Sequence, residues 1–484
     1  MNNGRLPAPG DLFSGSTGRS AVSAESLPRW FDARRIENAL NREKAPDRAE
    51  RCDILNKSLA LEPLTIEETA ALMRVEDEAG ITAILTSADV VKQRVYGDRI
   101  VLSAPLHVTN HCESECLYCA NRRSNGRVER KYMTPPEMRE AALKLIRQGH
   151  KRVFLVSGQL PGDDVDYLAE AAAILYTVHD GGGEIRCVNV SAGPLEAPQY
   201  AALLDAFVGT MLIYQDTYHE PDYRAAHVAG PKRDFSARLN APGAAFMAGA
   251  PDVGGGLMLG LGPWRYDLLG LVQHETHLAG EYGMNFRTVS LHRMRPAPGS
   301  LMEVPHPVND ADYLRCIAIT RLAVPHAGIV LTTREPSGIW RRGCGVGASQ
   351  LLTGSVANPY DDWTRATGSK IPFPLGEDCR VDEVVSFLLE EARHLPSFCA
   401  ACPRLGRRGA DFLSLVREYG IGNLCGPNSA ASFLEFLLRY ATPRNRPLGE
   451  SLLAEKLDNM SDHERGAAER LLAKVRSNCL DEFI

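Results

Sequence analysis

Eight short apolar runs, separated by stretches with helical spacing, follow one another between residues 99 and 355. Each run carries its polar residues chiefly near its C-terminal end. This alternation over about 270 residues predicts a (β/α)8 barrel, in which catalytic groups lie at the C-terminal ends of the strands. The runs are RIVLSAPLHV (99–108), RVFLVSG (152–158), EIRCVNVSAG (184–193), GTMLIYQDTY (209–218), VGGGLMLGLG (253–262), RTVSLHRMRP (287–296), GIVLTTRE (328–335) and GVGASQLLTGS (345–355).

The barrel is one of four parts into which the sequence divides. Residues 1–27 are rich in Gly, Ser, Pro and Ala, which predicts a disordered segment. Residues 28–98 have a helical pattern, and Thr65 stands where a helix N-cap is expected. The barrel is expected over 99–370. Residues 371–484 have a mostly helical pattern and form a separate expected domain, which carries a second group of cysteines.

The overall charge and hydropathy of the chain exclude some classes of partner. A net charge of −6 and a pI of about 6.1 give no sign of nucleic-acid binding. The sequence has no run of eighteen or more apolar residues and no secretory signal pattern. We therefore expect a cytoplasmic protein without a nucleic-acid or membrane partner.

Six of the 12 cysteines fall into two groups of three, and the rest are scattered singly. The first group follows the first strand run with the spacing C-x3-C-x2-C: Cys112, Cys116 and Cys119. Three thiolates can hold a [4Fe–4S] cluster and leave one iron open, whereas a structural metal site needs four ligands. The open iron could bind S-adenosylmethionine, with Tyr118 packing against the adenine. The alternatives are a zinc site that lacks one ligand and cysteines brought close by chance.

The spacing, the aromatic residue before the last cysteine and the position after strand one together resemble the radical S-adenosylmethionine superfamily. The second group, Cys399, Cys402 and Cys425, has the spacing C-x2-C-x22-C. Alone it could be a zinc or redox site. No fourth ligand stands at the usual offset, however, and the count of ligands favours a second [4Fe–4S] cluster with one open iron.

The chain from about residue 35 onward resembles the tyrosine lyases that mature [FeFe]-hydrogenase. The resemblance is carried by both cysteine groups and by motifs such as GHKRVFLVSG, GPKRDFSARL, LGLVQHETHL, RMRPAPG, TTREP and SFCAACPRLGRRGADF. It implies cleavage of the Cα–Cβ bond of L-tyrosine to p-cresol and dehydroglycine. Dehydroglycine is then converted to CO and cyanide at the C-terminal cluster, on a fifth iron linked through a free cysteine. A reducing electron donor and a hydrogenase-maturation scaffold protein are the implied partners.

The resemblance also implies roles for single residues. Thr332 and Arg334 of TTREP match the positions that bind the tyrosine carboxylate, which suits an arginine fork. The alternative for Arg334 is a structural salt bridge. His277, or else His274, stands where the family places a histidine ligand of the fifth iron. A lone histidine is as often structural, so both interpretations stay open.

Two expected cofactor-binding positions depart from the family. Gln159 and Asp216 stand where glutamate is usual, and both keep an oxygen that can accept a hydrogen bond. Arg238 and Lys232 are cations near strand ends that could contact the cofactor carboxylate or form ordinary ion pairs; Arg293 and Arg295 have the same two alternatives.

These departures leave two rival hypotheses. One is a diverged lyase, similar to 2-iminoacetate synthase, that cleaves tyrosine or another amino acid without making CO or cyanide. The other is a non-enzymatic iron–sulfur scaffold, in which the changes at Gln159 and Asp216 have disabled the radical step. The retained TTRE motif argues against the second hypothesis.

Overall fold

The computed structural model gives side-chain detail for most of the chain. The prediction of disorder for residues 1–27 lies outside the described residues, apart from Leu27. The described residues are 27–42, 44–160, 165–297, 299–354, 380–418 and 422–484.

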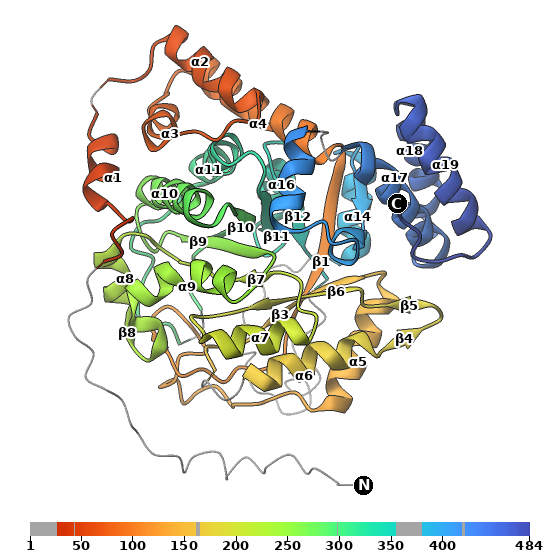
Figure 1. Ribbon diagram of the computed structural model, residues 1–484, viewed down its shortest axis with the longest axis horizontal. Helices are drawn as coiled ribbons and strands as arrows, with labels where there is room; N and C mark the ends of the chain where they lie inside the picture. Colours follow the sequence, from red (N-terminus) through yellow and green to blue (C-terminus); the bar gives the residue numbers. More distant parts are fainter. Residues whose placement is uncertain (1–26, 43, 161–164, 298, 355–379, 419–421) are drawn as a thin grey trace.

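Eight parallel strands form a closed barrel, because the last of them pairs back onto the first. All eight lie within the runs expected from the sequence, give or take one residue, so the predicted barrel is confirmed. Figure 1 shows the strands at the centre, with helices around them. The strands, in barrel order, are β1 (Arg99–His107), β3 (Arg152–Val156), β6 (Cys187–Ser191), β7 (Met211–Leu212), β9 (Val253–Leu259), β10 (Phe286–Arg293), β11 (Gly328–Thr332) and β12 (Gln350–Leu352).

The barrel helices begin at sequences that favour helix starts. Thr134 and Glu137 form a capping box before α5, and Asp234 and Asn309 cap α9 and α11. Two small antiparallel pairs decorate the loops: β2 (Glu115–Cys116) with β8 (His227–Ala229), and β4 (His179–Asp180) with β5 (Gly183–Glu184). The helices are α5 (Pro135–Arg147), α6 (Val165–Tyr176), α7 (Ala197–Asp205), α8 (Glu220–Ala226), η3 (Pro231–Arg233), α9 (Phe235–Met247), α10 (Trp264–Tyr282), α11 (Asp310–Ala323) and α12 (Ser337–Cys344).

The N-terminal part packs as helices against α10 and α11. Thr65 caps α3, and the Thr65 backbone N–H donates to the Glu68 carboxylate, so the predicted N-cap is confirmed. α4 packs against the core through a buried face that includes Ile84 and Val91. The helices are α1 (Ala33–Leu40), α2 (Arg48–Leu59), α3 (Ile66–Met73) and α4 (Glu78–Tyr96).

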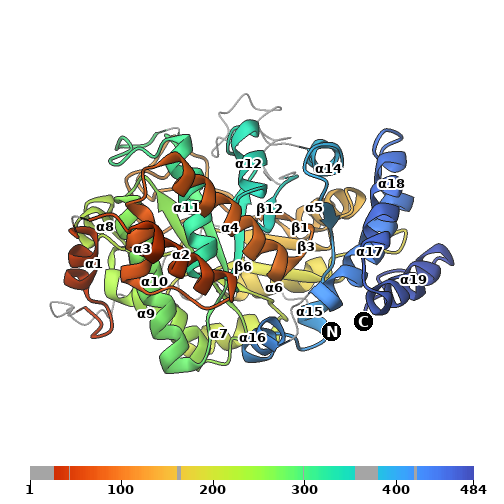
Figure 2. The same ribbon diagram turned by 90° about the horizontal axis from the view of Figure 1, so that it is seen from above.

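The C-terminal part adds a ninth strand to the barrel sheet, which the sequence pattern did not indicate. β13 (Leu395–Ser397) pairs in parallel with residues 99–101 of β1. Figures 1 and 2 both place the last two helices at the opposite end of the molecule from α1. The helices here are α14 (Val381–Glu390), α15 (Ala401–Arg404), α16 (Gly409–Glu418), α17 (Gly422–Arg439), α18 (Asn445–Asp458) and α19 (Asp462–Arg476). Among the described residues, no helix is long and apolar enough to cross a bilayer.

Candidate functional site

The first cysteine group lies on a loop at the C-terminal end of β1. Cys116 is buried and belongs to β2, where it pairs with His227 of β8. A turn brings the Cys119 backbone N–H to the Cys116 carbonyl at 2.9 Å. The Gln159 backbone N–H, just beyond β3, donates to Cys112 Sγ at 3.3 Å. The loop is therefore held by two other parts of the chain, the β8 strand and the end of β3.

Close backbone contacts fix this loop. A Cβ on Gly158 would come within 2.1 Å of the His111 carbonyl oxygen and 2.6 Å of Cys112 Cβ. A Cβ on Gly230 would meet the Glu113 carbonyl oxygen at 2.3 Å, and this glycine also has a φ of +82°. Only glycine fits at both positions without moving the cysteine loop.

The thiols of the first group are in an environment that opposes ionisation in the absence of metal. Burial raises the pKa of Cys116 and of Cys119, and the charge of Lys232 lowers each only in part. Thiolates at these positions need a metal to compensate their charge. The donor set therefore fits a cationic cluster.

Tyr118 packs into a charged group beside the loop. Its hydroxyl lies 3.0 Å from His227 Nε2 and 3.4 Å from Asp216 Oδ2, and Lys232 Nζ donates to it at 3.2 Å. Lys232 Nζ also forms an ion pair with Asp216 Oδ2 at 2.5 Å. Burial alone would raise the pKa of Asp216, but the charges of Lys232 and Arg238 and the hydrogen bond with His227 hold it well below its usual range. Asp216 is therefore a fixed negative charge at this end of the barrel.

Gln159 and Arg238 are the other two expected cofactor contacts. The Gln159 side chain packs against Gly193. A Cβ added to Gly193 would come within 2.2 Å of Gln159 Oε1. Arg238 is buried and donates through Nε to the Tyr214 carbonyl at 2.7 Å. Its Nη1 is buried without a hydrogen-bond partner among the described residues. A buried guanidinium with a spare donor fits the carboxylate of a bound cofactor.

Thr332 is the last residue of β11, and Arg334 follows the strand at the same end of the barrel. The Arg334 backbone N–H donates to Thr332 Oγ1 at 3.2 Å, and the Arg334 side chain is exposed. Burial and the charge of Arg334 lower the pKa of His107 to about 3 and that of His292 to about 4. These two histidines come from the ends of β1 and β10. The structure thus adds neutral imidazoles to the predicted site, and histidine at a strand end was the only sequence signal for them.

Arg293 and Arg295 form ion pairs with one buried carboxylate, at 2.5 Å and 2.9 Å from Glu335 Oε2. His274 and His277 lie instead on α10. His274 shares a hydrogen bond with the Tyr218 hydroxyl at 2.9 Å, and His277 stacks on Trp30 with a centroid distance of 4.6 Å. Among the described residues, no hydrogen bond or ring contact joins these two histidines to a cysteine of either group, so their role as iron ligands stays a prediction.

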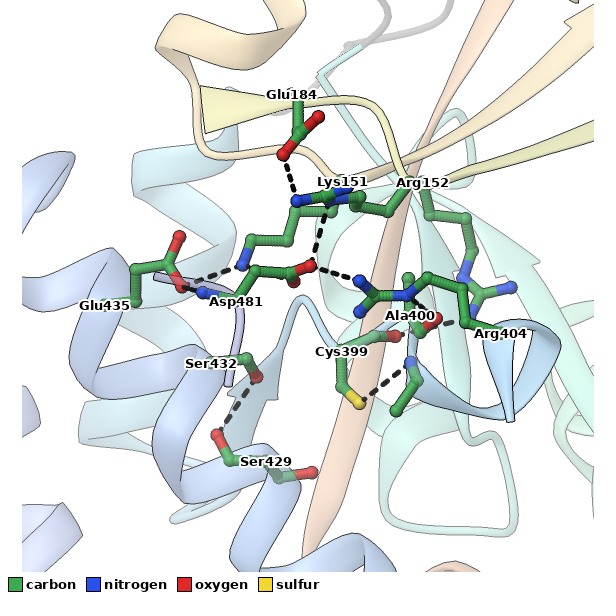
Figure 3. A network of polar contacts seen from close by, with 12 residues as sticks. Lys151, Arg152, Glu184, Cys399, Ala400, Arg404, Ser429, Ser432, Glu435 and Asp481 are labelled. Atoms are coloured by element: carbon green, nitrogen blue, oxygen red, sulfur yellow. Dashed lines mark hydrogen bonds and ion pairs between the residues drawn. The ribbon is translucent and has the colours of Figure 1, made fainter. Parts of the chain in front are cut away.

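The second cysteine group lies at the other end of the barrel. Cys399 follows β13, which pairs with the first residues of β1, while Cys112 comes after the last residue of β1. Figure 3 shows Cys399 beside Arg152, and its Sγ accepts from the Ala401 N–H at 3.5 Å. Cys402 on α15 and Cys425 on α17 share a hydrogen bond that lowers the pKa of Cys402 and raises that of Cys425.

β1 has nine residues, so at about 3.3 Å per residue the strand between the two cysteine groups spans about 30 Å. The described residues contain no group of three or more His, Cys, Asp or Glu side chains arranged to hold a single metal ion.

Comparison with known proteins matches two parts of the chain to two family models. Residues 106–264 match the Radical SAM superfamily (SAM being S-adenosylmethionine), and residues 290–408 match the Biotin and Thiamin Synthesis associated domain. The 2-iminoacetate synthase of Escherichia coli (strain K12) is 26% identical over 283 residues, which are 58% of this chain and 73% of that protein.

Solved structures match over nearly the whole chain. The X-ray structure of the FeFe-hydrogenase maturase HydG from Carboxydothermus hydrogenoformans has a TM-score of 0.78 and 29% identity, covering 91% of this chain and 97% of that chain. Another crystal structure, of HydG as a maturase of the [FeFe]-hydrogenase, has a TM-score of 0.88 and 32% identity, covering 94% of this chain and all of that chain. The present chain therefore belongs to the HydG family of radical SAM enzymes.

Proposed function

We propose that this protein cleaves the Cα–Cβ bond of L-tyrosine to p-cresol and dehydroglycine, and that dehydroglycine yields CO and cyanide at the second cysteine group. The products would serve assembly of the [FeFe]-hydrogenase active site. The observation that carries the proposal is the match to a HydG structure over 94% of the chain, in a sequence that carries two three-cysteine groups.

The first site would hold a [4Fe–4S] cluster through Cys112, Cys116 and Cys119. When bound, the cluster and S-adenosylmethionine supply a 5′-deoxyadenosyl radical. Arg238 offers its free Nη1 to the carboxylate of the cofactor. Tyr118, Gln159 and Asp216 complete the proposed cofactor contacts, with the Asp216 charge available to a cofactor ammonium group.

The substrate would lie between Arg334, Thr332 and the two histidines at the same end of the barrel. The guanidinium of Arg334 binds the tyrosine carboxylate, and the Thr332 hydroxyl adds a hydrogen bond. His107 and His292 have pKa values of about 3 and 4, so both are neutral at working pH and can each donate one hydrogen bond and accept another. Neutral partners leave Arg334 as the cation that selects a carboxylate.

The second site would hold a second [4Fe–4S] cluster through Cys399, Cys402 and Cys425, with a fifth iron linked to it through a free cysteine. Iron with an open position suits CO and cyanide as ligands. A reducing electron donor and a maturation scaffold protein that accepts the iron product are the proposed partners.

An anaerobic assay tests the proposal. Reconstituted protein is mixed with dithionite, S-adenosylmethionine and L-tyrosine, and p-cresol and CO are measured in the same tube. Both products are expected, Cys112→Ala should abolish 5′-deoxyadenosine formation, and Cys402→Ala should keep p-cresol but lose CO. If wild-type protein gives p-cresol without CO or cyanide, the diverged lyase is correct. If intact clusters give no cleavage of S-adenosylmethionine, the protein is a scaffold.

A further inference from the structure

Three arginines lie at the starts of barrel strands. Arg99 and Arg152 are the first residues of β1 and β3, and Arg287 is the second residue of β10. The N-terminal ends of parallel strands meet at one rim of a barrel. β13 brings the second cysteine group to this rim, because it pairs with residues 99–101.

Arg152 contacts the second cysteine group directly. Its Nη2 donates to the Cys399 carbonyl at 3.2 Å, and its Nη1 donates to Cys187 Sγ at 3.3 Å (Figure 3 shows Arg152 and Cys399). Its Nε is buried without a hydrogen-bond partner among the described residues. The guanidinium is therefore fixed beside the cysteines and keeps one donor free.

Arg99 and Arg287 reach the same group through aromatic rings. Tyr96, Phe412 and Cys425 belong to one apolar cluster. The Arg287 guanidinium lies 3.1 Å from the centre of the Phe412 ring, and that of Arg99 lies 5.7 Å from the centre of the Tyr96 ring. Both charges therefore lie beside the apolar side-chain cluster that contains Cys425.

Among the described residues, one carboxylate pairs with these three arginines. It is Asp252, at 3.8 Å from Arg287 Nε. Arg99 is buried, with a side-chain contact to the Tyr96 carbonyl, which has no net charge. Three guanidinium groups beside one carboxylate leave an excess of positive charge at the rim, so the rim favours a negative ligand.

We propose that Arg99, Arg152 and Arg287 form an anion site that holds the carboxylate of a small 2-imino or 2-oxo acid beside the second cysteine group. Planar guanidinium forks match a carboxylate and hold it in one orientation. The inference rests on the proposed function, which supplies dehydroglycine, a 2-imino acid, to this end of the barrel. It assigns to these arginines the capture of that carboxylate.

The test uses full-length protein in which Cys112, Cys116 and Cys119 are replaced by alanine, so that only the second cluster contributes a signal. Glyoxylate, the 2-oxo acid that matches dehydroglycine, is titrated into the reconstituted, reduced protein, and the electron paramagnetic resonance spectrum is recorded. Glyoxylate should change the spectrum saturably, and its neutral amide should bind at least about tenfold more weakly. Arg287→Met should weaken glyoxylate binding about tenfold or more, and Arg287→Lys should weaken it less.

Arg265→Met is the matched control. Arg265 also lies over an aromatic ring, at 4.5 Å from Trp264, and also pairs with a carboxylate, Asp312 at 3.5 Å, but it lies on α10 away from the rim. The Arg265→Met variant should bind glyoxylate with the same affinity as the parent protein.

Equal glyoxylate affinity in the parent, Arg287→Met and Arg152→Gln proteins would overturn the anion site and leave the proposed function intact. If Arg287→Met does not retain its cluster, Arg287→Lys and Arg152→Gln decide the matter in the same assay. If the parent protein shows no second-cluster signal after reconstitution, both the anion site and the proposed role of the second cysteine group are wrong.

Discussion

At the scale of single residues, Gly158 tests how tightly the first cysteine loop is held. Its backbone has no left-handed φ, so the cost of a side chain there is purely steric. Gly158→Ala would push a methyl group against the His111 carbonyl and Cys112 Cβ. We expect the free energy of unfolding to fall by about 1–3 kcal/mol. We also expect the variant to retain less than half of the iron of the first cluster. Gly126→Ala, whose Cβ would meet nothing within 4 Å, should retain full iron content by the same iron assay.

Arg334 can be separated from the cluster chemistry by kinetics. Arg334→Gln removes the guanidinium fork but keeps a hydrogen-bond donor, so KM for L-tyrosine should rise about tenfold or more. Cleavage of S-adenosylmethionine without tyrosine should change little. A variant with unchanged KM and a lower kcat would contradict the assignment of Arg334 to the substrate carboxylate.

Residue types and spacings showed which cysteines to group, but not what surrounds them. The C-x3-C-x2-C spacing is local, so it can be read from the sequence. The contact of Tyr118 with Asp216 joins residues 98 positions apart, and it depends on how two loops fold over the barrel. His107 and His292 are single histidines at strand ends, and nothing local distinguishes them from histidines of the core.

At the scale of elements, the eight strand runs were predictable because each is a short apolar segment, separated from the next run by a stretch with helical spacing. β13 was not. Its three residues, Leu395–Ser397, carry no strand pattern and form a strand only by pairing with β1, almost 300 residues earlier. The location of the second cysteine group at the N-terminal rim follows from that pairing, so it could not be inferred from the sequence.

A short segment near residue 481 holds α15, the helix that carries Cys402, through an ion pair. The Asp481 side chain is 11% exposed, lies 2.9 Å from Lys151 Nζ and also pairs with Arg404 of α15 (Figure 3). Asp481→Asn would remove the charge that pairs with Arg404, whereas Lys151 would keep its ion pair with Glu435 at 2.8 Å, so we expect a cost of up to about 3 kcal/mol of unfolding free energy. We expect loss of the second cluster before the first, measured as iron content and by electron paramagnetic resonance.

The neighbouring acid provides the control for this prediction. Glu482 pairs with Lys474 at 2.8 Å, and the Lys474 side chain is 56% exposed. Glu482→Gln should change the unfolding free energy by less than about 0.5 kcal/mol and leave both clusters in place. Equal cluster loss in the two variants would mean that Asp481 has no special role in holding α15.

At the scale of the whole molecule, β1 links the two cysteine groups. One group follows its last residue and the other lies beside its first residues, so under the proposed function a fragment made at the first site would travel along a barrel about 30 Å long to the second. The charges around the two cysteine groups also differ. The first site has the fixed negative charge of Asp216 among its cations, whereas the second has arginines in excess, which favours travel of a carboxylate toward the second site.

The buried histidines make the stability of the whole molecule depend on pH. Burial is the main cause that lowers the pKa of His107 and His274 to about 3 and of His150 and His292 to about 4. In the unfolded chain these groups titrate near pH 6.5. As pH falls from about 6.5 to about 4, the unfolded chain takes up protons that the folded protein does not. The free energy of unfolding should therefore be flat above pH 7 and fall in that window, by up to about 1.4 kcal/mol per pH unit for each histidine.

His150 isolates one of these contributions. Both of its ring nitrogens are buried without a hydrogen-bond partner among the described residues, so His150→Leu sacrifices no described hydrogen bond. Thermal unfolding of the variant and of the wild-type protein, at matched cluster content between pH 7.5 and 5, should show a shallower decline for His150→Leu, by about 1.4 kcal/mol per pH unit. His463→Leu, at an exposed position, should follow the wild-type curve. Parallel curves for His150→Leu and wild type would mean that His150 is protonated in the folded protein, because only then would its removal leave the proton uptake on unfolding unchanged.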